Sequence, residues 1–184
     1  MEILSCFIAI QFFLFSLVTI SCSKQNTSAK IGQEIIEQNI NIFVDELHWS
    51  TFEKNKNIIV PIFISNYVTE NKLFLDECDC FDIFNMEGFN IGTNSKYESF
   101  FIKTVPLKIE NKSIKLVEEN SNIDLEKFVE LQFNNFFLDK DQNRAFLIVE
   151  KIGHGTKSWT KEVYFFEKKG HKWKFYKKKL LMIG

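Results

Sequence analysis

The sequence predicts an α+β fold, in which an N-terminal amphipathic helix packs on a curved antiparallel sheet that ends in a four-stranded meander. Apolar residues recur at helical spacing over residues 31–48, alternate along several segments of the C-terminal third, and are separated there by short polar turns. The chain has 184 residues, of which 45% are apolar, with only 7 Gly and 2 Pro. It is therefore long enough for one domain with a well-packed core.

The helix is predicted over residues 31–48. Its apolar residues follow the spacing i, i+4, i+7, i+8 and i+11, while acidic and amide residues occupy the other side. The apolar stripe consists of Ile36, Ile40, Phe43, Val44 and Leu47. Such a stripe must be buried, and a sheet is the simplest surface that can bury it.

The first strand is predicted at residues 58–64, a β-branched run. Pro61 lacks a backbone N–H, so this strand is expected to lie at a sheet edge or to be broken there. Residues 66–100 show no clear pattern. Alternation resumes over residues 101–109, and Asn111-Lys112 predicts a turn into an extended segment at 114–117.

The C-terminal third predicts four further strands. Apolar residues alternate near 131–137, 145–149, 163–166 and 173–175, and polar or glycine-containing turns separate these segments. Consecutive strands joined by short turns pair antiparallel, so a meander is expected.

The N-terminal segment is more apolar than a core helix. Residues 3–21 contain no charge, and the chain turns polar directly after Cys22. A cleaved secretory signal, an uncleaved membrane anchor and a lipoprotein signal each fit this run. The organisation we predict is a lipoprotein signal peptide over 1–21, a polar tether over 22–30 and a single α+β domain over 31–184.

The residues Val18-Thr19-Ile20-Ser21-Cys22 resemble the lipobox of bacterial lipoproteins, in which a small residue precedes the modified cysteine. Met1-Glu2 departs from the family pattern because it lacks a basic residue, and Thr19 stands where Leu is commonest. The resemblance implies cleavage before Cys22 and lipidation of its thiol. It further implies a protein of the bacterial cell envelope, anchored to a membrane on its periplasmic face or at the cell surface.

The C-terminal hairpin carries a second resemblance. A strand ending in Lys168-Lys169-Gly170, followed by Lys172-Trp173-Lys174-Phe175, is similar to the last strands of small bacterial secreted proteins and lipoproteins of unknown function. This resemblance implies secretion and a sheet, and it implies no reaction.

One acidic cluster has partial calcium-loop spacing. Positions one, three, five and twelve of an EF-hand loop are occupied by Asp139, Asp141, Asn143 and Glu150. Arg144 stands at the sixth position, where glycine makes the sharp turn, and the flanking residues alternate as in strands. We therefore predict a hairpin turn, whose side chains bond their own backbone, and no metal site.

Charge is unevenly distributed along the chain. Its 23 basic and 24 acidic residues nearly cancel, which argues against a nucleic-acid partner. Residues 70–90, which include Cys78 and Cys80, hold six acids and one lysine, a net charge of −5; residues 157–184 hold nine lysines and two glutamates, net +7. Lys172, Lys174 and Lys178 share parity, opposite to that of Trp173 and Phe175, so they are expected on one face of the last strand. They form a candidate surface for an acidic partner, or simply a solvated strand face.

No catalytic motif emerges, and His154 has no obvious partner in the sequence. The expected function is therefore a non-enzymatic, lipid-anchored binding module without a cofactor, which meets the membrane through its anchor and a protein partner through its domain. An inhibitor or immunity-type protein is a specific version of this hypothesis. The alternative is a small periplasmic hydrolase or ligand-binding protein with a site in the concave face of the sheet. A polar cavity containing His154 or paired carboxylates would favour the alternative, and a filled apolar core would favour the binding module.

Overall fold

The computed structural model describes residues 28–44, 60–71, 80–89, 91, 97–106, 108–109, 112–118, 128–154 and 158–184. These residues are mostly β-sheet. A seven-stranded sheet has the order β4-β5-β1-β6-β7-β8-β9, and a second sheet pairs β2 with β3. The strands are β1 (Val60–Ser65), β2 (Tyr67–Val68), β3 (Phe100–Phe101), β4 (Lys108–Ile109), β5 (Lys112–Val117), β6 (Phe128–Leu138), β7 (Arg144–His154), β8 (Ser158–Lys169) and β9 (Lys172–Ile183).

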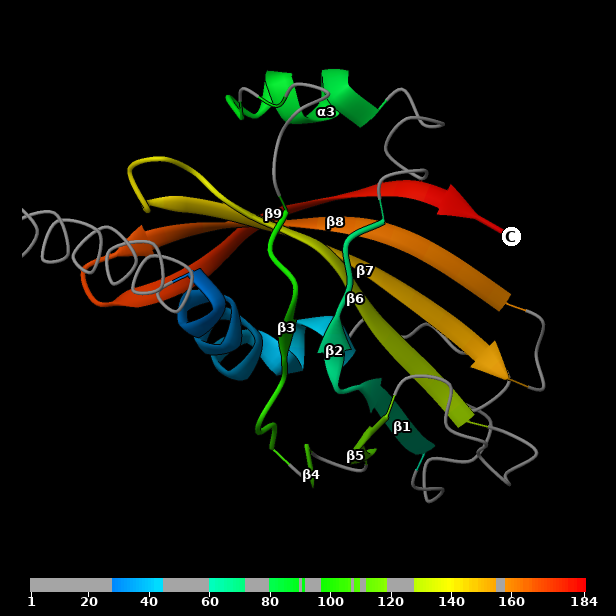
Figure 1. Ribbon diagram of the computed structural model, residues 1–184. Helices are drawn as coiled ribbons and strands as arrows, with labels where there is room; N and C mark the ends of the chain where they lie inside the picture. The colour runs from blue at the N-terminus through cyan, green and yellow to red at the C-terminus, as the bar shows by residue number, and fades with distance from the viewer. Residues whose placement is uncertain are drawn as a thin grey trace, which may run out of the picture.

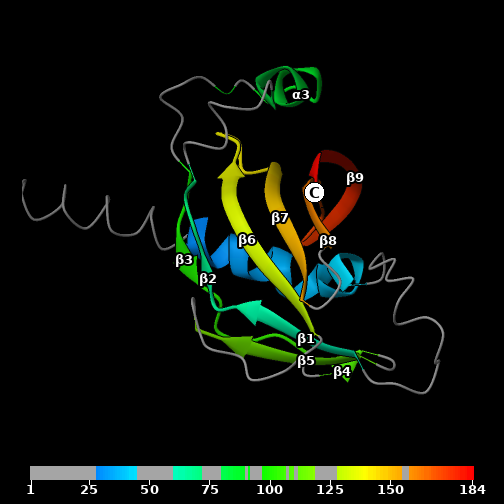
Figure 2. The same ribbon diagram turned by 90° about the vertical axis from the view of Figure 1, so that its right-hand side faces the viewer.

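A helix over residues 28–44 lies on one side of the large sheet, and the short helix α3 (Cys80–Met86) lies on the other (Figure 1). Figure 2 shows the sheet curving around the longer helix. We call the side that faces residues 28–44 the inner face and the side that faces α3 the outer face. Residues 28–30, predicted as tether, are already helical, whereas residues 1–27 and 45–48 lie outside the described residues.

The antiparallel half of the sheet comprises β6, β7, β8 and β9. These strands follow one another in the chain and pair in sequence order. At the β6–β7 turn, the Asp139 carboxylate accepts bonds from the backbone N–H groups of Asn143 and Arg144, at 2.8 and 3.1 Å. The β8–β9 hairpin turns at Gly170, whose φ of 64° is favourable for glycine.

The other half of the sheet contradicts the predicted fold class. β1 lies parallel to both β5 and β6, so the sheet is mixed rather than antiparallel, and the protein is mostly β rather than α+β. Alternation within a strand carries no information about the direction of its neighbour, which explains the error. Pro61 also lies inside the sheet. It pairs with Ser113 on one side, while pairing with β6 begins only at Ile62, so β6 requires no N–H from Pro61.

A bulge in β6 joins the two sheets. Asn135 has a φ of 49° and is fully buried, and its side chain bonds to both the N–H and the carbonyl of Asn71, at 2.6 and 3.0 Å. Thr69 also bridges to Asn134 in parallel. The segment that contains β2 is thereby fixed beside β6.

The inner face holds the larger part of the apolar core. Phe43 of the longer helix is fully buried, and its ring meets Phe133, Tyr164 and Phe166 in edge-to-face contacts with centroids 5.0–6.1 Å apart. Gly32 allows the Phe100 ring to approach the same helix, because a Cβ there would lie 2.3 Å from that ring. The helix therefore packs tightly along its length.

The outer face holds a second, smaller cluster under α3. Phe84 of α3 stacks on Phe146 with centroids 4.5 Å apart, and Phe89 packs edge-on against the same ring. After α3 ends at Met86, Gly88 has a φ of 77° and the N–H of Phe89 bonds to the carbonyl of Phe84, which caps the helix. Arg144 holds this end, since it donates to the carbonyls of Glu87 and Gly88 at 3.0 and 2.7 Å.

Candidate interaction surface

The edge strand β9 is the most exposed apolar feature among the described residues. It is twelve residues long and pairs with β8 alone among the described strands. On its other edge, the N–H of Trp173 donates to the Gln38 side chain at 3.1 Å and its carbonyl accepts from Asn39 at 3.5 Å. Its exposed large apolar residues lie mainly near its end: Tyr176, Leu180, Met182 and Ile183. A long edge with uncovered apolar side chains is the surface on which a further strand can add.

The predicted lysines of β9 do not share one face. A register shift at Phe165/Phe166 makes Tyr176 an extra residue, so Lys178 falls opposite Tyr164 on the inner face. Lys172 and Lys174 precede the shift and lie on the outer face, opposite Lys169 and Glu167. The prediction that Lys178 shares a face with Lys172 and Lys174 is wrong, because alternation in the sequence does not reveal the bulge.

The acidic and basic segments of the sequence meet at α3. Glu87 accepts ion-paired bonds from Lys177 at 2.5 Å and from Lys179 at 3.2 Å. The hydrogen bond from Lys177 holds the pKa of the Glu87 carboxyl below its ordinary value, against the opposing effect of burial. Part of the charge on β9 is thus used to fix α3, which leaves exposed Lys172 and Lys174 at the start of the strand.

A compact ionic group lies on the inner face. Glu162 pairs with Lys151 and Lys178, each at 2.8 Å, and accepts a bond from the Tyr164 hydroxyl at the same distance. The Lys151 ammonium is 2.7 Å from that hydroxyl. Burial lowers the pKa of Lys151 and raises that of Tyr164, so Glu162 is the counter-charge that keeps the group together.

The outer face carries a polar row beyond α3. His154 pairs with Glu130 at 2.9 Å and stacks on Phe128 with centroids 4.1 Å apart, while Glu150 pairs with Lys161 at 3.2 Å. Strand alternation puts His154 on the face opposite the helix over residues 28–44, because inner-facing Val149 has the other parity. His154 therefore does not line the concave face that the hydrolase alternative requires.

The four calcium candidates are not brought together. Asp139 bonds the backbone of its own turn, whereas Glu150 lies six residues beyond Arg144 on β7 and accepts bonds from Trp159 and Lys161. Six strand residues span about 20 Å. Asp141 and Asn143 are exposed in the turn, as the hairpin interpretation expects.

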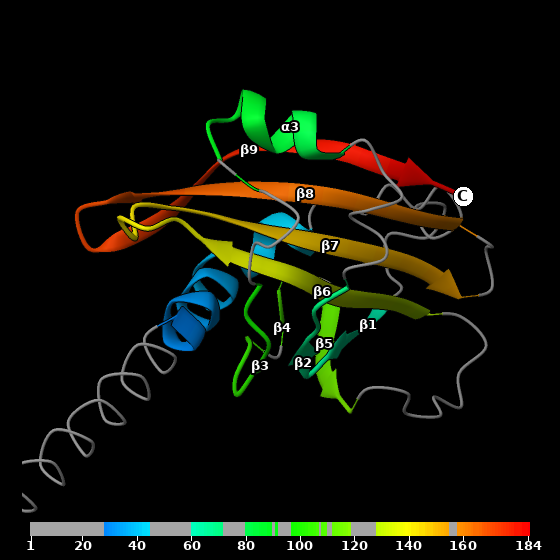
Figure 3. The same cartoon turned by 45° about the horizontal axis from the view of Figure 1, so that its top comes forward.

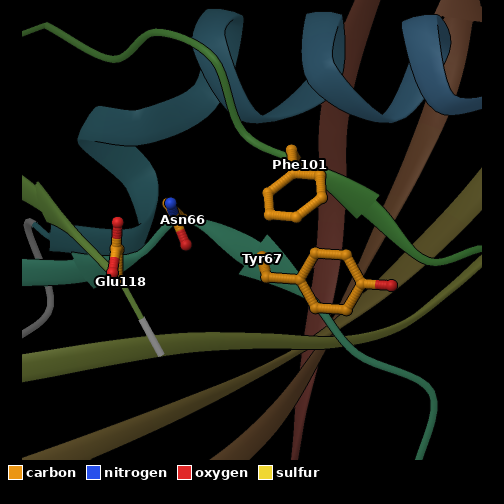
Figure 4. Close-up of a pocket in the computed structure, with 4 residues that line it drawn as sticks. All are labelled: Asn66, Tyr67, Phe101 and Glu118. Carbon is orange, nitrogen blue, oxygen red and sulfur yellow. The ribbon is translucent and has the colours of Figure 1, made fainter. Parts of the chain in front are cut away.

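Cys22 and Cys78 lie outside the described residues, and the backbone of Cys80 begins α3. A groove that the sequence did not predict lies near β2 and β3 and is lined by Asn66, Tyr67, Phe101 and Glu118 (Figure 4). No motif marks these residues, because they come from three separate segments.

Comparison with known proteins found no match to a family model, to a curated protein or to a solved structure. Within the part of the chain that the structure describes, no helix has both the length and the apolar composition to cross a membrane.

Proposed function

We propose that this chain is a non-enzymatic binding module of the bacterial cell envelope, anchored to a membrane through Cys22, which binds a protein partner along β9. The observation that carries the binding role is the edge of β9, twelve residues long, with exposed lysines at its start and exposed apolar residues at its end. The lipobox-like residues before Cys22 support the anchor.

The partner segment we propose is an extended, acidic strand. The outward N–H and C=O of Trp173 already bond to Gln38 and Asn39 of the helix over residues 28–44, so an added strand would pair with β9 beyond Trp173, whatever its own sequence. Lys172 and Lys174 then select for acidic side chains beside the start of β9, and Leu180 and Met182 select for apolar ones beside its end. A toxin neutralised by charge-complementary binding is one partner of this kind.

The composition of the inner face supports a binding module over a hydrolase. The space between the sheet and the helix over residues 28–44 is filled by apolar side chains, among them Phe43, Phe133 and Tyr164. The polar group nearby, centred on Glu162, is internally paired. His154 and Glu130 are paired with each other on the opposite face.

The anchor is tested by the intact mass of the mature protein. We expect a chain that begins at Cys22 and carries acyl groups, and we expect Cys22→Ser to release the protein from the membrane fraction or to block processing. A native product that begins elsewhere, or that bears an unmodified thiol at Cys22, contradicts this part of the proposal.

The binding surface is tested by charge reversal. We expect the Lys172→Glu/Lys174→Glu double variant to lose at least about tenfold in affinity for the captured envelope partner, and the wild-type affinity to fall as salt is raised. Lys140→Glu, an exposed lysine of the β6–β7 turn, is the matched control. A partner that binds the double variant as tightly as the wild type excludes the β9 surface.

A further inference from the structure

The groove near β2 and β3 has one aromatic wall. Tyr67 and Phe101 pair across the two strands, and their ring centroids are 4.7 Å apart with an interplanar angle of 56°. Phe101 is 65% exposed, so most of its ring is accessible to a ligand. Figure 4 shows the two rings together, with the Asn66 side chain beside them and Glu118 beyond it.

The polar side of the groove is held in place by backbone bonds. The N–H of Asn66 donates to the carbonyl of Val117 at 2.8 Å, and its carbonyl accepts from the N–H of Ile102 at 2.7 Å. Both backbone groups of Asn66 are thus engaged by neighbouring segments, and the side-chain amide lines the groove. An amide offers both a donor and an acceptor to a ligand.

Among the described residues that line the groove, Glu118 is the one that carries a charge, so the lining disfavours an anionic ligand. The volume is about 350 Å³, towards the small end of the range for small-molecule sites. An uncharged ligand with one apolar face and several hydroxyls fits an aromatic wall that stands beside an amide and a carboxylate.

We propose that this groove binds a neutral sugar residue. The C–H face of the sugar ring rests on Phe101 and Tyr67, and its hydroxyls bond to the Asn66 amide and the Glu118 carboxylate. A protein contact is disfavoured because the other exposed large apolar residues of the described chain lie on α3 and β9 rather than around Phe101. The proposal requires neither the anchor nor the β9 surface.

The test is a titration of the isotopically labelled full-length protein, followed by amide NMR shifts. The probes are the N-acetylglucosamine trimer and maltotriose, each added to about 10 mM, enough to saturate a site with Kd near 1 mM. For at least one probe we expect saturable shifts at residues 66–68 and 100–103. Loss of one stacked ring in Phe101→Ala should weaken binding about threefold to tenfold.

Matched variants keep this test decisive. Phe101→Tyr should retain binding, because it preserves the ring. Met86→Ala, which removes an apolar side chain that is 70% exposed on α3, should leave the affinity unchanged. The proposal is overturned if neither sugar gives a saturable shift, if Phe101→Ala binds as well as the wild type, or if Phe101→Ala abolishes binding of a protein partner while neither sugar binds.

Discussion

The two faces of the large sheet are covered in different ways. On the inner face, a helix over residues 28–44 buries a continuous apolar core that reaches from β1 to β9. On the outer face, the seven-residue helix α3 covers a smaller aromatic cluster, and the rest of that face carries ion pairs such as Glu130–His154. Figure 3 shows the two helices on opposite sides of the strands.

We infer that the contacts of the inner face stabilise the whole domain, whereas the contacts under α3 stabilise only that helix. A helix as short as α3 is unstable by itself, so it depends on Phe84, on Arg144 and on the Glu87 ion pairs. Breaking these contacts should release α3 while the sheet stays folded. Breaking the inner face should unfold everything, because its core connects most strands of the sheet.

The largest effect is expected from Phe43→Ala on the inner face. The side chain is fully buried among three aromatic rings that cannot close the space it leaves. We expect a loss of about 3–5 kcal/mol in the free energy of unfolding, measured by urea denaturation. Phe101→Ala, which removes an exposed ring, is the control and should change stability little. A Phe43→Ala variant as stable as the wild type would show that the inner face is not the principal core.

The Glu162→Gln variant tests the ionic group of the same face. It leaves Lys151 and Lys178 without their shared counter-charge, and we expect a loss of about 3 kcal/mol at pH 7, since Lys178 is a quarter exposed and can turn towards water. Burial already lowers the pKa of Lys151 from 10.5, and loss of Glu162 lowers it further.

The further lowering of the Lys151 pKa in Glu162→Gln determines how the stability of the variant changes with pH. The unfolded chain binds the Lys151 proton more tightly than the folded variant, so the variant regains stability as the pH rises towards 10.5. The difference in the free energy of unfolding between the wild type and Glu162→Gln, measured by urea denaturation, should therefore be smaller at pH 10 than at pH 7. A difference that is constant or grows with pH contradicts this role for Glu162.

Local sequence patterns correctly predicted the longer helix and the four C-terminal strands. The stripe of Ile36, Ile40 and Phe43 lies in the described helix, and the alternation after residue 128 lies in β6 to β9. The direction of β1 was missed, because it depends on β5 and β6, which lie far along the chain. No clear pattern marked residues 66–100, and the elements described there, such as β2 and α3, are short and are held by distant partners.

The candidate sites were harder to predict than the strands. Regular strand alternation predicted that Lys178 and Lys172 lie on the same face of β9, but the bulge at Tyr176 moves Lys178 to the other face. The groove unites Tyr67, Phe101 and Glu118, which the chain separates by tens of residues without a shared motif. Strand patterns indicate which face a residue occupies only until the first bulge, and they carry no information about which distant segments meet.

On the outer face, Arg144→Ala should release α3 without unfolding the sheet. The variant loses the bonds to the carbonyls of Glu87 and Gly88 and the contact over the Phe89 ring, whose centroid is 5.0 Å away. We expect local destabilisation of α3 by about 1–3 kcal/mol. Hydrogen exchange should accelerate in residues 83–89 and stay unchanged in β7 and β8. Lys140→Ala, in the adjacent turn, is the control; faster exchange throughout the sheet would contradict the separation of the two faces.

The smallest effect concerns acid and the Glu87 ion pairs. Because Lys177 and Lys179 hold the pKa of Glu87 below 4.5, the stabilisation of α3 by this carboxylate is complete above pH 4.5 and is lost as the pH falls through the lowered value. Hydrogen exchange of α3 amides, corrected for the intrinsic pH dependence of exchange, should therefore show weaker protection at pH 3 than at pH 6. Glu87→Gln should reduce this difference, whereas Asp82→Asn, which changes a carboxyl within α3, should preserve it. If the acid sensitivity persists in Glu87→Gln, a different carboxylate holds α3, and the contact between the acidic and basic segments at Glu87 is incidental to its docking.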